Sequence, residues 1–137
     1  MQISEIKNKM IQTWNSEVCA VIDTWQNYYV SLDDFKNSIS SGFEKCKNNN
    51  GIAWIVASSK ATGNFSREIQ NFIGTDVFPN FLKNGIIYFI TIPAENPLTK
   101  LTVMNASSKA GPNGVTLVEV NNIESAIKFL KNKKLEK

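Results

Sequence analysis

The sequence predicts an α/β fold with a mostly parallel five-stranded sheet and four helices, in the order ββαβαβαβα. Two observations lead to this prediction. Residues 52–57 and 86–92 are apolar runs without polar alternation, which is typical of strands buried on both faces. Segments with apolar residues at helical spacing separate the strands, and strands that alternate with helices form parallel sheets through right-handed crossovers.

The totals fit a single domain over residues 1–137, in which residues 1–9 and 133–137 are peripheral. The chain has 42% hydrophobic residues, 20% charged residues and a net charge of +3, as is ordinary for a globular protein. No apolar run approaches the roughly 18 residues of a membrane span. The first eight residues contain no apolar signal segment, so we expect a cytoplasmic protein with both cysteines as free thiols.

The chain contains no histidine. This removes the commonest general base, the usual partner of serine and cysteine nucleophiles, and the commonest zinc ligand. Asp33 and Asp34 are explained as acids at the start of a helix. We therefore predict no metal site and no cofactor, and the sequence favours a non-enzymatic protein.

The first strands are predicted to form a β-hairpin. Residues 1–9 are polar, and we expect them to be frayed or loosely helical. Alternation over residues 10–14 and the apolar run 17–25 predict an edge strand and a central strand joined by a tight turn. Unpaired backbone on the edge strand at 10–14 is a candidate contact for a homodimer. Asp23 is the only acid in a predicted buried strand, and a position at the strand end, in solvent, would explain it.

Caps and apolar stripes predict the first two helices. Ser31 is expected to cap the first helix, which ends in the Asn-rich stretch before Gly51. Ser66 is expected to cap the second helix. Pro79 interrupts that helix, which predicts either one kinked helix or two short ones.

Two further helices are predicted beyond residue 95. Asn96 followed by a proline is typical of a helix start. After a strand at 115–120, Asn121 is expected to cap the last helix. The lysines near the end of this helix complement the helix dipole. Without interleaved aromatic residues or a binding motif, they predict no nucleic-acid surface.

Several segments resemble the SpoIIAA-like family, which has the STAS-like regulatory fold. The resemblance covers about residues 10–132, and the matching pieces are the helix start at Ser31, the strand at 52–57 with its loop, and the segments 77–81 and 120–126. In anti-sigma-factor antagonists of this fold, a kinase partner phosphorylates a serine that opens the helix after the third strand. Ser66 matches that serine in type, whereas the family's neighbouring aspartate and glycine are missing. The resemblance implies a protein partner and makes Ser66 a candidate phosphate acceptor.

The loops after residues 25 and 57 follow two neighbouring predicted strands. Because the carboxyl ends of parallel strands meet at one edge of a sheet, we expect these loops to share a contact surface. Aromatic residues are frequent at interaction hot spots. The candidate binding residues are Trp25, Tyr28, Tyr29, Ser58, Ser59, Asn64 and Phe65. The competing interpretation is that the aromatic residues only cover the end of the core.

Two basic residues lie in or beside the second of these loops. Lys60 and Arg67 are candidate anion-binding residues near the start of the second helix, where backbone N–H groups are free. A solvated polar loop is the competing interpretation. For Ser66, the competing interpretation is an ordinary N-cap, because a capping hydroxyl is already hydrogen-bonded.

Three functions remain open. The favoured one is a non-enzymatic regulatory module that binds a protein and is modulated at Ser66. The second is a carrier of a small apolar or lipid-like ligand between the sheet and the helices, with walls from Phe72, Phe78, Phe81, Val103 and Met104. An apolar cavity would favour the carrier. The third is a hydrolase in which a buried Lys60 activates Ser58 or Ser59, and an exposed Lys60 would exclude it.

Overall fold

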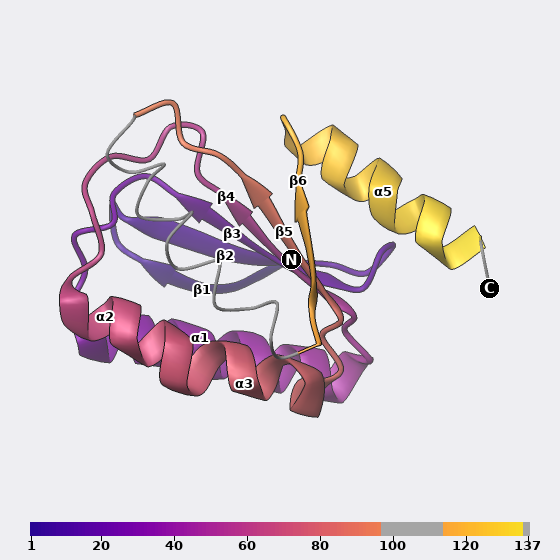
Figure 1. The fold of residues 1–137 in the computed structure, drawn as a ribbon, viewed down its shortest axis with the longest axis horizontal. Coiled ribbons are helices and arrows are strands. Elements are labelled where there is room, and N and C mark those ends of the chain that lie inside the picture. Colours follow the sequence, from indigo (N-terminus) through magenta and orange to yellow (C-terminus); the bar gives the residue numbers. More distant parts are fainter. Residues whose placement is uncertain (97–113, 136–137) are drawn as a thin grey trace.

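The computed structural model describes residues 1–96 and 114–135. Its strands form one six-stranded sheet in chain order: β1 (Gln2–Ile6), β2 (Met10–Asn15), β3 (Ala20–Trp25), β4 (Ala53–Ala57), β5 (Tyr88–Ile92) and β6 (Thr116–Glu119) (Figure 1). Its helices are α1 (Leu32–Asn49), α2 (Arg67–Phe72), α3 (Phe78–Phe81) and α5 (Ile123–Leu135), with a π-helical turn, Ile73–Val77, and a 3-10 turn, Leu82–Asn84. The predicted α/β class is confirmed. The helix expected after Asn96 lies outside the described residues.

The sheet is mixed. Strands β1, β2 and β3 pair antiparallel, whereas β3, β4, β5 and β6 pair parallel. In the centre, Ala53 of β4 lies opposite Tyr88 of β5, and Ala57 lies opposite Ile92. The prediction that the two apolar runs lie side by side in the same direction is confirmed.

The prediction for residues 1–9 was wrong, because Gln2–Ile6 form the edge strand β1. The Trp14 N–H donates to the Met1 carbonyl oxygen at 2.8 Å, and Ile3 and Ile6 pack against the core. The pairing of β1 with β2 shifts register near its start, which breaks the alternation that marks a strand in sequence. Strand β2 is therefore paired on both sides, and the homodimer contact expected at residues 10–14 is not available.

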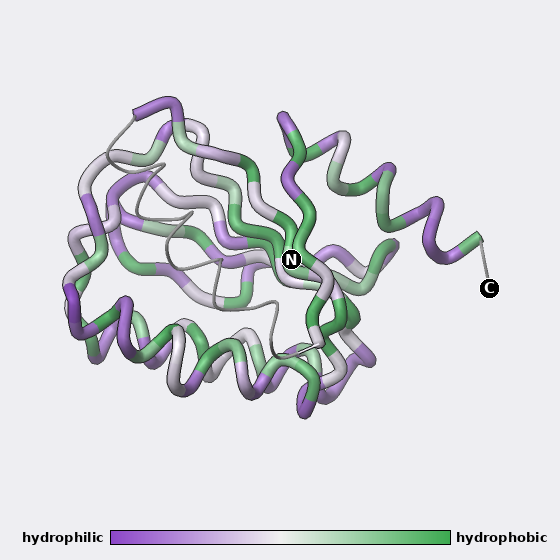
Figure 2. Tube along the Cα trace, in the orientation of Figure 1, coloured by the Kyte–Doolittle hydropathy of each residue, from purple (hydrophilic) through white to green (hydrophobic). Residues whose placement is uncertain are grey.

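Two apolar cores lie on opposite faces of the sheet. Because successive side chains of a strand point to opposite faces, Val21 and Trp25 enter one core, and Ala20 and Ile22 enter the other. Helices α1, α2 and α3 cover the first face, and α5 covers the second (Figure 1). Figure 2 shows hydrophobic residues concentrated along the central strands, whereas the helices alternate between hydrophobic and hydrophilic residues. We call these the α1–α3 core and the α5 core.

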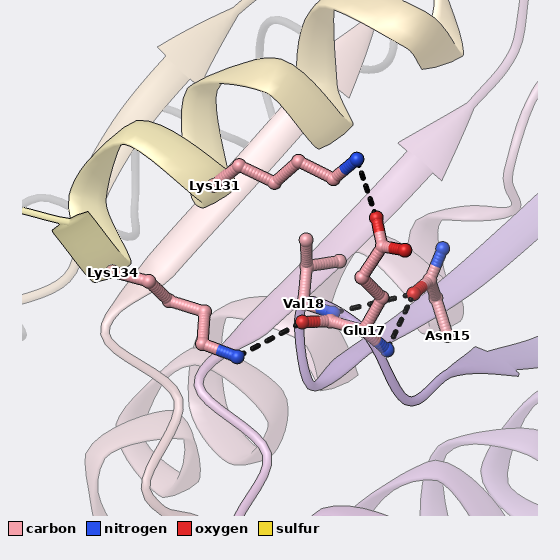
Figure 3. Close-up of polar contacts among 5 residues, drawn as sticks. All are labelled: Asn15, Glu17, Val18, Lys131 and Lys134. Atoms are coloured by element: carbon pink, nitrogen blue, oxygen red, sulfur yellow. Dashed lines mark hydrogen bonds and ion pairs between the residues drawn. The ribbon is translucent and has the colours of Figure 1, made fainter.

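An ion pair and a hydrogen bond join helix α5 to the turn between β2 and β3 (Figure 3). The Lys131 Nζ lies 2.5 Å from the Glu17 Oε1, and the Lys134 Nζ donates to the Glu17 carbonyl oxygen at 3.0 Å. The turn is closed by the Asn15 Oδ1, which accepts from the N–H groups of Glu17 (2.9 Å) and Val18 (3.2 Å). Lys131 also holds the pKa of Glu17 below its usual value. Two of the lysines near the end of α5, Lys131 and Lys134, therefore contact Glu17.

Of the N-caps predicted for α1, α2 and α5, those at Ser31 and Ser66 are confirmed, and the one at Asn121 is wrong. The Ser31 Oγ accepts from the Asp34 N–H at 3.1 Å, as predicted for α1. The last cap is Asn122 rather than Asn121: the Ser125 N–H donates to the Asn122 Oδ1 at 2.8 Å. Because α5 begins at Ile123, the residue directly before it takes the capping position. No helix within residues 1–96 or 114–135 is long and apolar enough to cross a membrane.

Candidate functional site

A cavity of about 50 Å³ lies in the α1–α3 core, between the sheet and the helices. Its described walls come from β3 to β5, α1, the π-helical turn, α3 and two loops: Asp23, Trp25, Tyr28, Phe35, Ile39, Trp54, Val56, Phe65, Ile73, Val77, Phe78, Phe81 and Phe89. All of these residues except Asp23 are apolar or aromatic. Phe78 and Phe81 were predicted as walls of a ligand site, whereas Phe72, predicted with them, is not among the described lining residues. Val103 and Met104 lie outside the described residues.

Aromatic rings form two groups among the residues that line the cavity. In one group, Tyr28 stacks on Phe65 with ring centroids 4.2 Å apart, and Trp25 meets the edge of Tyr28 at 5.0 Å. In the other group, Trp54 stacks on Phe81 at 5.8 Å. Stacked and edge-on contacts are the preferred arrangements of aromatic pairs.

A π-helical turn supplies the wall between α2 and α3. The Phe78 N–H donates to the Ile73 carbonyl oxygen, five residues earlier, and Ile73 and Val77 line the cavity. Pro79 follows directly and has no N–H to continue the α-helical pattern. The expected kinked or divided helix is therefore a helical stretch with a π-helical turn at its centre. Such turns are frequent at functional sites.

Asp23 is the single acid among the described residues of the cavity wall, and it belongs to a buried polar network. It is 3% exposed. Its Oδ1 accepts from the Gln12 Nε2 at 3.0 Å, and its Oδ2 accepts from the Trp54 Nε1 at 2.8 Å. The Gln12 Nε2 also donates to the Ser38 carbonyl oxygen at 2.9 Å, and the Gln12 Oε1 accepts from the Ser4 Oγ at 3.0 Å. The network thus joins four strands to α1, and the expected solvent-exposed position of Asp23 was wrong.

The environment of Asp23 disfavours its charge. Burial raises the pKa of Asp23 to about 7, although the hydrogen bonds from Trp54 and Gln12 act in the opposite direction. Neither ion pair among the described residues includes Asp23. At neutral pH, both the acid and the carboxylate are therefore populated at the cavity wall.

The loops after β3 and β4 meet, as the sequence predicts. The Tyr28 N–H donates to the Thr62 carbonyl oxygen at 2.9 Å, and the Thr62 N–H donates to the Gln26 carbonyl oxygen at 3.0 Å. The hydroxyl groups of Tyr28 and Ser58 share a buried hydrogen bond. The position of residues 58–66 beside Trp25 and Tyr28 is confirmed.

Exposure separates the candidate binding residues into three groups. Trp25, Tyr28, Ser58 and Phe65 are buried, so they offer no surface to a partner in this conformation. Ser59 and Asn64 are half-buried, and only the Tyr29 side chain is strongly exposed, at 64%. The aromatic residues of these loops, apart from Tyr29, cover the end of the α1–α3 core. This outcome matches the competing interpretation of the sequence.

The polar residues of the second loop have ordinary roles. The Ser66 Oγ is exposed and accepts from the Ile69 N–H at 3.2 Å, as an N-cap of α2. The Lys60 side chain is 79% exposed, and its Nζ lies 3.5 Å from the Glu95 Oε2. Arg67 is exposed at the start of α2. The hydrolase arrangement that requires a buried Lys60 beside Ser58 is therefore wrong.

No group of three or more Cys, Asp or Glu side chains in the described part of the chain could hold a metal ion. Comparisons with protein-family models, with curated proteins and with solved structures found no match.

Proposed function

We propose that the protein binds a small, mostly apolar ligand in the cavity between the sheet and α1–α3, without catalysing a reaction. The cavity itself is the observation that carries the proposal. Ligand sites are typically apolar and contain a small number of polar groups that orient the ligand. Here the walls are aromatic and aliphatic, and Asp23 is the only acid among the described lining residues.

The cavity volume limits the size of the ligand. A cavity needs roughly 10–15 Å³ to hold one water molecule, whereas drug-sized ligands occupy roughly 300–1,000 Å³. The observed 50 Å³ therefore suits a molecule of a few heavy atoms. A lipid-like ligand would require the walls to move apart, and the observed volume gives no support for it.

The state of the Ser58 and Tyr28 hydroxyl groups and of the Lys60 amino group also supports binding rather than catalysis. The Ser58 hydroxyl is hydrogen-bonded to the Tyr28 hydroxyl, and burial raises the pKa of Tyr28 above its usual value. Neither group is activated as a nucleophile in this arrangement. Lys60 lies in solvent beside Glu95.

Titration with isobutanol, followed by methyl NMR, tests this function. We expect concentration-dependent shifts at the cavity methyl groups of Ile39, Ile73 and Val77. Ile55 and Ile90 belong to the α5 core and serve as internal controls with unchanged shifts. Absence of shifts at the cavity methyl groups, or equal shifts in both cores, would contradict ligand binding at this site.

A second candidate function is protein docking at the rim formed by the two loops. The exposed ring of Tyr29 carries this proposal. The Tyr29 N–H donates to the Asn27 Oδ1 at 2.8 Å, and the ring packs closely on Gly63, whose φ of +79° has little tolerance for a side chain. A rigid, exposed aromatic residue is a typical hot-spot residue.

Affinity capture tests docking with a matched pair of variants. We expect Tyr29→Ala to lose a protein partner that Leu82→Ala retains, because Leu82 is exposed on the 3-10 turn Leu82–Asn84 rather than at the rim. Identical capture by both variants would remove the docking proposal. Tyr28 and Phe65 are unsuitable for this test because their rings are buried.

We also propose that the chain is a SpoIIAA-like (STAS-like) domain and that docking is modulated by phosphorylation of Ser66. The parallel strands β3 to β6, with a polar loop from β4 into α2, support the family proposal. The Ser66 hydroxyl is exposed, and the added negative charge of a phosphate is favourable at a helix start. Mass spectrometry of protein from its native cell tests this: phosphate at Ser66 supports modulation, and a fully unmodified serine contradicts it.

A further inference from the structure

The position of Asp23 in the cavity wall indicates the chemical class of the ligand. The carboxyl group lies in the cavity wall with one hydrogen bond to each oxygen, from Gln12 and from Trp54. An ionised carboxylate offers about four acceptor sites. The described residues use two of these sites, which leaves acceptor capacity for a donor inside the cavity that Asp23 lines.

No other described group supplies a counter-charge to Asp23. In the part of the chain that the structure describes, Asp23 interacts electrostatically with the side chains of Tyr28, in the loop after β3, and Cys46, on α1. Burial raises the pKa of Tyr28 and raises the pKa of Cys46 to about 12, so both side chains are neutral near pH 7. A buried carboxylate without a positive partner is costly in an apolar core.

We propose that the ligand is a small apolar amine whose ammonium group pairs with the Asp23 carboxylate, while its alkyl part fills the aromatic cavity. This inference rests on the ligand-binding function proposed above. The amine supplies a positive charge that no residue within 1–96 or 114–135 supplies at this position. Its N–H groups donate to the acceptor sites that Gln12 and Trp54 leave open.

The energetic balance favours an amine over other polar ligands. The fold has already removed the Asp23 carboxylate from water, so pairing adds only the desolvation of the ammonium group. A ligand carboxylate would place two acids in one site, and at least one would have to be protonated. A neutral alcohol can fill the same volume but leaves the charge of Asp23 without a partner.

Three probes of similar size test the inference: isobutylamine, isobutanol and isobutyrate. Binding of each to the full chain is measured by methyl NMR at Ile39, Ile73 and Val77. At about pH 8, where Asp23 is ionised, we expect isobutylamine to bind about tenfold more tightly than isobutanol, as one charge-assisted hydrogen bond implies. We expect isobutyrate not to bind. At about pH 5, where Asp23 is protonated and the amine remains cationic, the preference should disappear.

An Asp23→Asn variant provides the matched control. It should bind isobutylamine no more tightly than isobutanol at any pH. If the variant does not fold, the pH series on the wild-type protein still decides, because it needs no substitution. Equal affinities of amine and alcohol at about pH 8 would overturn the amine inference and leave the ligand-binding function in place. If none of the three probes binds, the ligand-binding function itself fails.

Discussion

Trp54 donates its indole Nε1–H to the Oδ2 of Asp23 over 2.8 Å, and this bond joins the adjacent strands β3 and β4 at the cavity wall. Both side chains project from regular strands of the sheet rather than from loops. Groups held by strands and by buried hydrogen bonds are positioned more precisely than groups on loops. The acid is therefore a fixed part of the cavity.

The pH dependence of stability should report the burial of Asp23. Its pKa is about 7 in the folded protein, against an ordinary value of 3.8 for an aspartate in water, so the folded state retains the proton over this range. The resulting stabilisation is fully present below about pH 4 and is lost as the pH rises through about 7, by on the order of 4 kcal/mol. Urea unfolding at intervals from pH 4 to 8 measures this.

Asp23→Asn should remove this contribution, because an amide does not titrate. In the variant, an NH₂ group replaces one of the two carboxyl oxygens that accept hydrogen bonds from Gln12 and Trp54. Because an NH₂ group cannot accept a hydrogen bond, one of these two bonds is lost, and we expect the variant to be less stable than the wild type at acidic pH. Asp33→Asn, at an exposed helix start, is the control and should retain the wild-type pH profile. Parallel profiles for the wild type and Asp23→Asn would show that Asp23 is not buried as described.

Gly42 allows α1 to approach the indole of Trp54. A Cβ at this position would overlap the Trp54 ring, and it would lie 3.0 Å from the Gln12 Nε2. We expect Gly42→Ala to destabilise the protein by about 1–3 kcal/mol through overpacking, against a helix-propensity gain of about 1 kcal/mol. Ser40→Ala, on the exposed side of α1, should be neutral or stabilising. Equal urea midpoints for the two variants would contradict the close approach.

Filling the cavity should stabilise the protein and prevent ligand binding. Val77 lines the cavity from the π-helical turn, and Val77→Ile adds one methylene group there. At roughly 24 cal/mol per Å³, the gain is at most about 1 kcal/mol. We expect a higher urea midpoint and loss of the isobutanol-induced shifts. Val118→Ile, beside the α5 core, should leave isobutanol binding unchanged, and retained binding in Val77→Ile would contradict the assigned site.

The Ser66 hydroxyl should contribute to stability as a helix cap. Because the Ser66 Oγ accepts from the Ile69 N–H at 3.2 Å, we expect Ser66→Ala to cost about 1 kcal/mol in unfolding free energy. Ser66→Asp keeps an acceptor in the same place and should cost less. If calorimetry finds the alanine and aspartate variants equally stable, the cap makes no contribution.

Much of the fold follows from local sequence signals. Residues 52–57 and 86–92 are apolar without interruption, so their burial in a parallel sheet could be predicted. Strand β1 was missed because a register shift near its start breaks its alternation, and because Gln2 and Glu5 are exposed at the edge. The cap of α5 was displaced by one residue, since two asparagines in succession are equally good caps.

The candidate site was predicted less completely. The meeting of the two loops follows from strand direction alone, and it was found. The depth of Tyr28 and Phe65 depends on how closely α1 and α2 cover them, which no local pattern specifies. An acid within an apolar strand, as at Asp23, is a sequence pattern that can indicate a buried polar site. Its partner Gln12 lies directly opposite on β2, and only the register of the sheet reveals this.

The most direct test is a crystal structure of the protein under xenon pressure, because xenon enters apolar cavities that are large enough to hold it. We predict bound xenon in the α1–α3 core, in contact with Ile73, Val77 and Phe89. A structure without xenon in that core, or with xenon only among Ile55, Ile90 and Leu130 of the α5 core, would contradict the proposed ligand site.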